Sequence, residues 1–165
     1  MLHSFIRGLD SLSGISTTNA HCDIPCKIYD PSSAQIAALS VVRLIDIMEE
    51  AADGGKSGLE MHNTISRCVM RKEEEAEKAK HEIRIIWGDY FKTPQKEAFP
   101  EIDKLTHDIM LKGSACKQGV NRKDAEELVE LINRFAEVFW ATKDIKTSRH
   151  TCPYPPSLET VYPVL

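Results

Sequence analysis

The feature that most constrains the fold of this chain is a long helical repeat in its middle. Between Ile65 and Tyr90 the residues of one face advance by alternating steps of four and three, which predicts an amphipathic α-helix. The repeat consists of Ile65, Val69, Lys72, Ala76, Ala79, Ile83, Ile86 and Tyr90, with Lys72 as the one charged interruption. The polar run RKEEEAEKAK at 71–80 is then a solvated face.

Three further segments show the same period. In the first, Asp30 can cap the helix, Pro31 suits its first position, and the run DGGKSG at 53–58 ends it. The third begins at Pro100 and fades near Gly113, and the fourth follows a cap at Asn121. Their apolar residues are Ala38, Val41, Val42, Ile45 and Met48, then Ile102, Leu105 and Ile109, then Ala125, Leu128, Ile132, Phe135 and Phe139. Four helices with short connections and no alternating strand pattern predict an all-α fold, an antiparallel four-helix bundle.

Bulk properties narrow the class of protein. A chain of 165 residues with a net charge of −4 is long enough for one domain and is not basic, as a nucleic-acid-binding protein usually is. No apolar run approaches the roughly 20 residues that cross a membrane. Five scattered cysteines do not resemble a secreted disulfide framework, so reduced thiols or metal ligands are expected.

The chain divides into three parts by composition. Residues 1–20 are predicted to be a leader or propeptide, which ends in a small residue and lacks the apolar core of a secretory signal. Residues 21–146 hold a metal-binding hook and the four helices. Residues 147–165 carry four prolines and are expected to form an irregular tail over the bundle or an interface, with Cys152 exposed.

Chemistry concentrates in the run HCDIPC, where His21, Cys22 and Cys26 lie around Pro25. Inside a chain these three residues could bind zinc, the two cysteines could form a disulfide, or the thiols could have no special role. Other motifs do not supply a site. The run GGKS lacks the first glycine of a phosphate-binding loop, and no histidine follows a glutamate at the spacing of di-iron bundles.

Cleavage after Ala20 would change this chemistry, because His21 would then present a free α-amine. That amine, the next amide nitrogen and the Cys22 thiolate can close fused chelate rings, and Cys26 can complete a planar set of two nitrogens and two sulfurs. The imidazole of His21 would approach from the axial side. A planar set of this kind favours nickel or copper over zinc, and it indicates a redox site.

The run HCDIPCKIYDP, from His21 to Pro31, resembles the metal hook of the nickel-dependent superoxide dismutase family. The later runs WGDYFKTP, PEIDKL and FWATK are similar to segments of that family's second, third and fourth helices. The resemblance extends from about Ala20 to Lys143.

The resemblance implies a propeptide removed before His21 by a processing protease, a right-handed four-helix bundle and a homohexamer. It implies a nickel ion that cycles between Ni(II) and Ni(III) while superoxide becomes dioxygen and hydrogen peroxide. The metal ligands would be the amine and imidazole of His21, the amide and thiolate of Cys22, and the thiolate of Cys26. Asp23 and Tyr29 would line the approach and order small anions or water.

Two positions depart from the family's pattern. Lys27 stands where the family usually has glycine, and its charge could attract superoxide or have no kinetic role. The family orients the axial imidazole with a glutamate and an arginine, and an ungapped placement puts Ala37 and Glu75 there. The sequence leaves three alternatives open: another residue substitutes for this pair, activity is reduced, or the placement is wrong.

Three functions therefore compete. The first is a nickel superoxide dismutase activated by cleavage, which is the prediction we carry forward. The second is a nickel-binding helical oligomer without turnover, and the third is a structural bundle with a Cys22–Cys26 disulfide. Neither a nucleic acid nor a membrane is expected as a partner, and the cytoplasm is the default compartment, with an organelle as the alternative.

Overall fold

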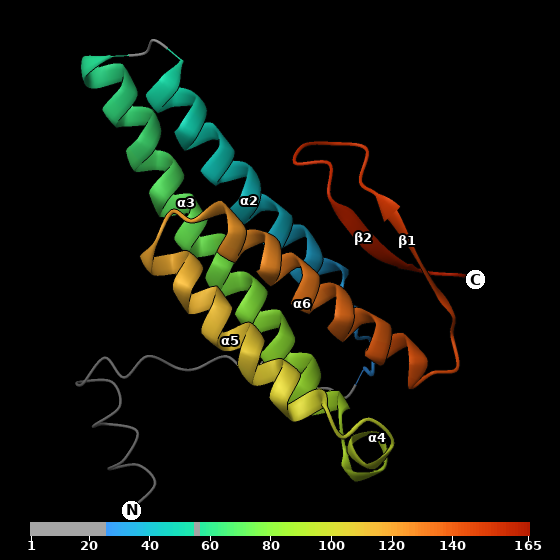
Figure 1. Cartoon of the computed structure of the whole chain (residues 1–165). Helices are drawn as coiled ribbons and strands as arrows, with labels where there is room; N and C mark the ends of the chain where they lie inside the picture. Colours follow the sequence, from blue (N-terminus) through green and yellow to red (C-terminus); the bar gives the residue numbers. More distant parts are fainter. Residues whose placement is uncertain (1–25, 55–56) are drawn as a thin grey trace, which may run out of the picture.

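The computed structural model describes residues 26–54 and 57–165, and this part of the chain is mostly helical (Figure 1). Four long helices account for most of it. The helices are α2 (Ser32–Asp53), α3 (Gly58–Ile85), the π-helix η1 (Ile86–Tyr90), the short α4 (Thr93–Ala98), α5 (Ile102–Gln118) and α6 (Arg122–Ala141). We call the part from α2 to α6 the helical body.

The long helices pack side by side, α2 against α3 and α6, and α5 against α3 and α6. Most of the residues that the helical period selected form the core between them, whereas Ile65, Val69 and Tyr90 are partly buried and pack against it. Ala38, Val41, Val42, Ile45, Met48, Ala76, Ala79, Ile83, Ile86, Ile102, Leu105, Ile109, Ala125, Leu128, Ile132, Phe135 and Phe139 are all buried. The helical period therefore identified this core correctly, because each helix can remove its apolar stripe from water only against its neighbours.

Two predicted helix starts are confirmed. The Asn121 side chain accepts a hydrogen bond from the backbone amide of Lys123 at 3.0 Å and so caps α6. At α2, the Asp30 carboxylate accepts from the amide of Ser32 at 2.8 Å, while Pro31 lies just before the first helical residue. Both side chains satisfy amides that have no partner within their helix.

Lys72, which interrupts the apolar period, is buried and has a structural role. Its ammonium group donates hydrogen bonds to the carbonyl oxygens of Cys116, Lys117 and Gly119 at the end of α5, at 2.9 Å for Lys117 and 2.8 Å for Gly119. The final carbonyls of a helix have no partner in their own helix, and a cation there is favourable. The lysine of α3 thus caps α5.

The expectation that the third helix fades near Gly113 is wrong, because α5 continues to Gln118. Gly113 is buried where the stem of Lys80 crosses it, and a Cβ atom there would lie 2.7 Å from the Lys80 Cγ atom. The ammonium group of Lys80 then reaches the Ser114 hydroxyl at 2.9 Å. The glycine therefore permits a close approach of α3 and does not end the helix.

The tail is not irregular throughout, which corrects the all-α prediction. It contains β1 (Thr147–Thr151) and β2 (Glu159–Pro163), which form an antiparallel pair with Arg149 opposite Val161. We call residues 147–163 the hairpin. Cys152, which the sequence analysis expected to be exposed, is buried at 2 % exposure. The fold is therefore mostly helical with one small sheet beside α6 (Figure 1).

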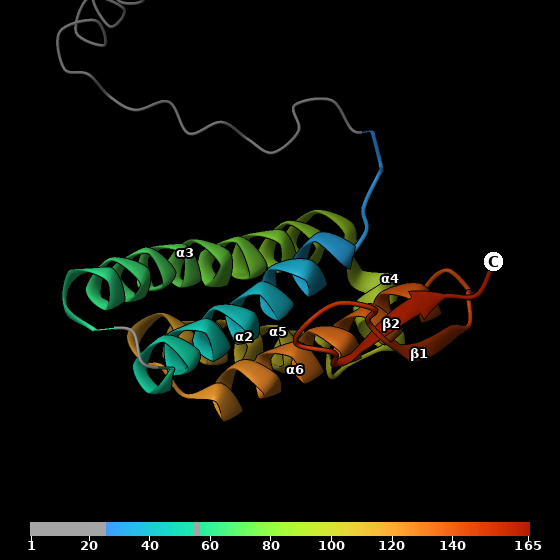
Figure 2. The ribbon, with the colours of Figure 1, turned by 90° about the horizontal axis from the view of Figure 1, so that it is seen from above.

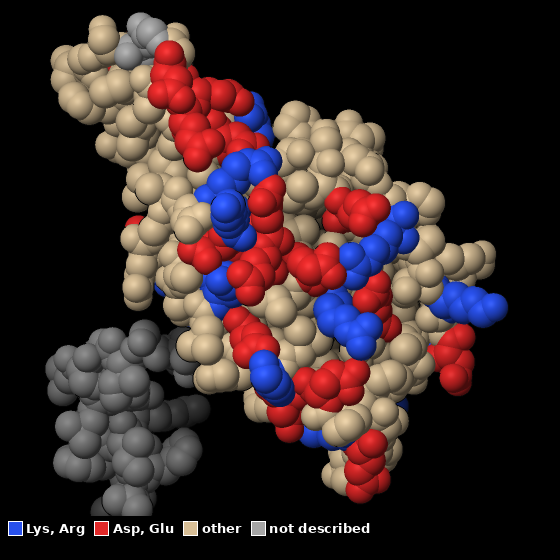
Figure 3. All heavy atoms as spheres, viewed as in Figure 1, with Lys and Arg blue, Asp and Glu red and all other residues tan. Residues whose placement is uncertain are grey.

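The start of α2 and the hairpin lie at the same end of the molecule, and α4 lies near them (Figure 2). Acidic and basic side chains are interspersed over the face that Figure 3 shows, which agrees with the many ion pairs between helices. In the part of the chain that the structure describes, none of the helices combines the length and apolar character needed to cross a membrane.

Candidate metal centre

Residues 26–30 form an extended stalk that leads into α2, and they are the described part of the predicted hook region. Cys26, Lys27, Ile28 and Asp30 are exposed, whereas Tyr29 is half-buried. Lys27 has φ of 60°, in the left-handed region that favours glycine. The stalk leaves the helical body at the end where α2 begins (Figure 2).

Tyr29 fixes one side of the stalk through a stack of aromatic rings. Its ring lies 5.8 Å from that of Tyr90, and Tyr90 lies 5.0 Å from Phe139 of α6. Tyr90 is the last residue of η1, and π-helical turns are frequent at functional sites because they re-aim the residues that follow. The π-turn ends α3 with Tyr90 directed toward the stalk.

Hydrogen bonds hold Tyr90 in this position. The Thr142 hydroxyl donates to the Phe139 carbonyl at 2.6 Å, and a threonine hydroxyl has a single proton. The Tyr90 hydroxyl, 2.7 Å from the same Thr142 oxygen, is therefore the donor of that pair. Tyr90 thus links the end of α3 to the end of α6, and its ring is a fixed surface for Tyr29.

A positive charge lies beside these rings. The ammonium group of Lys143 is 4.7 Å from the centre of the Tyr90 ring and 5.1 Å from that of Phe139. A cation held over an aromatic face is attracted to the ring and keeps its charge near the stalk. Lys27 and Lys143 thus bring basic groups to one end of a chain whose net charge is −4.

A cavity of about 220 Å³ borders the stalk at Asp30. Its walls combine the start of α2 with the end of α6 and with the hairpin. It is lined by Asp30, Ser32, Gln35, Ile36, Trp140, Tyr154, Thr160, Val161, Tyr162 and Pro163. The stalk therefore borders the aromatic rings through Tyr29 and the hairpin through the cavity at Asp30.

The predicted site residues divide into two groups. His21, Cys22 and Asp23 lie outside the described residues, whereas Cys26 and Tyr29 belong to the stalk. Within residues 26–54 and 57–165, no three histidine, cysteine or acidic side chains come together in a group that could hold a metal. Cys68, Cys116 and Cys152 are buried, and burial raises the pKa of the Cys116 thiol to about 11.

Ala37 and Glu75 occupy different environments. Ala37 is fully buried in the core. The Glu75 carboxylate is largely buried and pairs with Arg71 on the same helix at 3.0 Å. At the two positions that the ungapped placement gives, the structure therefore has a buried alanine and an ion pair within α3.

The sequence did not predict that Tyr90 and Lys143 lie beside the stalk. The sequence placed Tyr90 only in the apolar repeat of a helix, whereas the structure places the Tyr90 ring against Tyr29 of the stalk. The signal was available in the runs WGDYFKTP and FWATK, which carry Tyr90 and Lys143 and lie far from the hook in sequence.

Comparison with known proteins identifies the family. The nickel-containing superoxide dismutase family matches residues 16–143, which include the whole hook and the helical body. The chain belongs to this family. A curated relative, the nickel superoxide dismutase of Streptomyces coelicolor, is 35% identical over 127 residues, which cover 77% of this chain and 91% of the relative. The enzyme of Streptomyces seoulensis is 35% identical over 125 residues, covering 76% of this chain and 89% of the relative.

Solved structures agree with the family assignment. The native nickel superoxide dismutase superposes with a TM-score of 0.65 at 34% identity, over 74% of this chain and 99% of that one. A structure of nickel-containing superoxide dismutase with the nickel ligation of the oxidised state gives 0.66 at 33% identity, over 75% and 99%. The family match ends at residue 143, so the hairpin lies beyond it.

The donor chemistry of the hook fits the metal of this family. Cys26 places a soft sulfur donor at an exposed position on the stalk, and His21 and Cys22 add nitrogen and sulfur donors within five residues. Thiolate and nitrogen donors suit nickel, whereas carboxylate clusters suit harder ions. The residues present in the hook therefore fit nickel.

Proposed function

We infer that this chain is a nickel-dependent superoxide dismutase, with nickel as its cofactor. The reaction converts two superoxide anions and two protons into one dioxygen and one hydrogen peroxide. The observation that carries this conclusion is the family match over residues 16–143, which includes the hook and every helix of the helical body.

Activation requires cleavage between Ala20 and His21 in this proposal. The nitrogen of His21 is an amide until then and cannot serve as an amine ligand. The ligands of the cleaved chain are the amine and imidazole of His21, the amide and thiolate of Cys22, and the thiolate of Cys26. Nickel held by these donors supplies one-electron redox chemistry by alternating between Ni(II) and Ni(III).

The described residues suggest how the protein treats the substrate. Tyr29, held against Tyr90, offers a phenol hydroxyl that can order a water or a small anion beside the hook, with Asp23 as its companion. Lys143 adds a fixed positive charge near this surface, which raises the local concentration of an anionic substrate. In this proposal these residues bind, orient and steer superoxide toward the hook, where nickel, when bound, would supply the redox chemistry.

The assembly and compartment follow the family in this proposal. The long helices form its antiparallel four-helix bundle, and several copies associate as a homo-oligomer, by resemblance a homohexamer. Large apolar side chains that are exposed in the single chain support association. They include Ile28, Ile36, Leu59, Met70 and Leu111. The cytoplasm is the proposed compartment, and an unidentified protease removes the leader.

The test compares two chains that differ by one residue. One begins at His21, and the matched control retains Ala20 before it. Both are loaded with nickel, and metal content, the mass of the N-terminal peptide and superoxide consumption are measured. We expect nickel and activity only in the chain that begins at His21.

Each other result has a definite meaning. Nickel bound without superoxide turnover would favour the nickel-binding oligomer. A Cys22–Cys26 disulfide without nickel would favour the structural role. Equal nickel binding and activity in the control that retains Ala20 would refute the proposed ligand set.

A further inference from the structure

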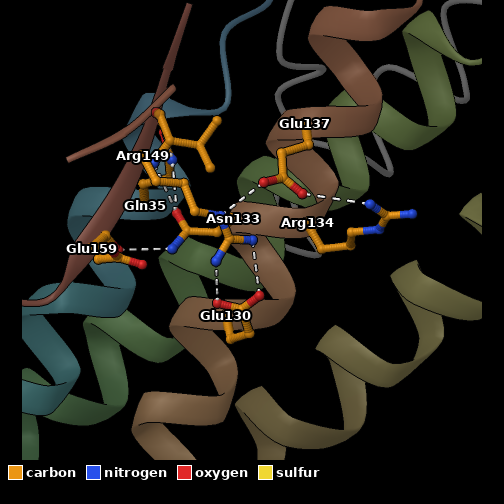
Figure 4. A network of polar contacts seen from close by, with 8 residues as sticks. Gln35, Glu130, Asn133, Arg134, Glu137, Arg149 and Glu159 are labelled. Carbon is orange, nitrogen blue, oxygen red and sulfur yellow. Dashed lines mark hydrogen bonds and ion pairs between the residues drawn. The ribbon is translucent and has the colours of Figure 1, made fainter. Parts of the chain in front are cut away.

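The hairpin is attached to the helical body by two side-chain amides that complete the free edge of its inner strand. The Val161 amide donates to the Asn133 Oδ1 atom at 3.2 Å, and the Val161 carbonyl accepts from the Gln35 Nε2 atom at 3.0 Å. The Asn133 amide also donates to the carbonyl of Glu159 at 2.8 Å (Figure 4). Gln35 and Asn133 thus take the place that a third strand would occupy beside β2.

The two amides also bind each other, at 3.0 Å between Gln35 Nε2 and Asn133 Oδ1. Gln35 is 5 % exposed and Asn133 is 1 % exposed. Both protons of the Gln35 amide are used, and the Asn133 oxygen accepts two hydrogen bonds. A buried network that is satisfied in this way fixes geometry, because losing one member leaves the others without partners at a cost of about 1–3 kcal/mol.

Arg149 provides a second attachment, from β1 to α6. Its guanidinium group donates two hydrogen bonds to the Glu130 carboxylate at 2.7 and 2.9 Å, and one to Glu137 at 2.8 Å (Figure 4). The planar guanidinium matches a carboxylate with two bonds, so the attachment also sets direction. These pairs are more exposed than the amide network. The hairpin is thereby held at both of its strands.

The hairpin is attached to the first turn of α2, directly after the stalk. Gln35 lies in the first turn of α2, and its backbone amide donates to the carbonyl of Pro31 at 3.1 Å. The cavity beside the stalk is bounded by Asp30 on one wall and by Thr160 and Tyr162 of β2 on another. The hairpin therefore contacts the turn of α2 from which the stalk and the metal hook depart.

We propose that the hairpin is a positioning element for the metal hook, and that Gln35 and Asn133 are the positioning residues. They hold the first turn of α2 between β2 and α6, next to the stalk whose Tyr29 packs against Tyr90. The described residues 26–30 are then restrained by the Tyr29–Tyr90 contact and by the turn of α2 that the hairpin holds. The inference rests on the proposed function, and it adds an element that lies beyond the family match at residues 16–143.

The first experiment uses the nickel-free full-length chain and measures amide hydrogen exchange. In Gln35→Leu we expect exchange in the first two turns of α2, residues 32–39, to be roughly tenfold faster, because the turn loses its buried partners. Arg149→Met removes the ion pairs between β1 and α6 and leaves the amide network intact. We expect a smaller acceleration of amide exchange in the same residues. The Arg149→Met variant also tests the proposal if Gln35→Leu does not fold.

The matched control is Arg122→Met. Arg122 pairs with Asp46 of α2 at 2.7 Å and so joins the same two helices, α2 and α6, at the opposite end of α6. We expect this variant to leave exchange at residues 32–39 unchanged. If all three variants accelerate exchange evenly along α2, the hairpin only stabilises the fold and the proposal is overturned.

The second experiment uses chains that begin at His21 and are loaded with nickel. We expect Gln35→Leu to lose nickel to a chelator about five- to tenfold faster than the parent, and to shift its nickel–sulfur absorption bands. Arg122→Met is expected to match the parent in both measurements. Equal rates and spectra in all variants would contradict the proposal.

The two experiments separate the inference from the function on which it rests. If the parent chain that begins at His21 binds no nickel, the proposed function fails. The hydrogen-exchange comparison still decides whether the hairpin restrains the start of α2, because it needs no metal.

Discussion

At the scale of single residues, Lys27 stands out because its backbone is in the left-handed region, with φ of 60°. A residue with a Cβ atom is strained there by roughly 1 kcal/mol, whereas glycine adopts this conformation freely. The resemblance to the nickel superoxide dismutases leads us to expect glycine at this position, and glycine would adopt the observed backbone without this strain.

Replacing Lys27 by glycine tests for this strain. We expect Lys27→Gly to relieve the backbone strain, although the added freedom of the unfolded chain offsets part of the gain, so the net stabilisation is about 0.5 kcal/mol or less. Urea unfolding measures it. Lys27→Ala is the control, since alanine keeps the Cβ atom and removes the charge. A gain for alanine equal to that for glycine would show that charge and not strain is the cause.

The charge of Lys27 has a separate consequence for the reaction. We expect Lys27→Glu to lower the rate with superoxide about threefold at low ionic strength, because it replaces an attractive charge near the hook by a repulsive one. The difference is expected to fade as salt is added, since salt screens exposed charges. Rate measurements over a range of salt concentrations check this. A variant that matches the parent at all salt concentrations would leave Lys27 without a kinetic role.

The sequence identified the hook residues because they are close together in the chain and share a chemistry that metals need. It did not identify Tyr90 or Lys143 as their neighbours, because these residues reach the stalk only through packing of distant helices. Contacts between residues far apart in the sequence depend on where each helix ends. The π-turn at η1 cannot be inferred from an apolar repeat of 3.6 residues.

At the scale of elements, α3 and α5 are joined by a cap that comes from a neighbouring helix. The Lys72 ammonium group is buried, and burial lowers its pKa below the ordinary value. The carbonyl oxygens at the end of α5 compensate by accepting hydrogen bonds from the ammonium group. This explains why a lysine is tolerated within an apolar stripe.

Removing this cap is expected to be costly. We expect Lys72→Met, which keeps most of the side-chain volume, to lower the free energy of unfolding by about 2 kcal/mol, because the carbonyls at the end of α5 lose a charged partner. Chemical denaturation measures the loss. Lys78→Met, at an exposed position of the same helix, is the control and is expected to change stability by less than about 0.5 kcal/mol. If the two substitutions had equal effects, the cap would contribute nothing.

The hairpin shows why some elements escape prediction. Its strands are short, polar and separated by prolines, so local sequence gives no alternating pattern. A two-stranded hairpin is marginally stable alone, and this one depends on amides 126 residues away at Gln35 and 28 residues away at Asn133. The long helices were predicted well because each carries its own periodic apolar face.

At the scale of the whole molecule, the helices are tied together by ion pairs that respond to pH. Glu77 of α3 accepts hydrogen bonds from Arg84 at 2.7 Å and from Lys117 of α5 at 2.9 Å. These partners lower the pKa of Glu77 from 4.5 to about 2. Because the folded-state pKa is below the ordinary value, the carboxylate stabilises the fold at pH values above about 4.5.

This stabilisation is expected to disappear as the pH falls from about 4.5 to about 2, where the carboxylate of the folded chain takes up a proton. We expect Glu77→Gln to be less stable than the parent near pH 7 and to show a shallower loss of stability between these pH values. Urea midpoints measured from pH 7 down to pH 2 test it, with Glu73→Gln as an exposed control on the same helix. Near pH 2 the Glu77 carboxylate of the parent takes up a proton and loses its charge, so the stabilities of the parent and of Glu77→Gln should converge there. Parallel curves for the two proteins across the whole range would mean that this ion pair does not couple the helices to pH.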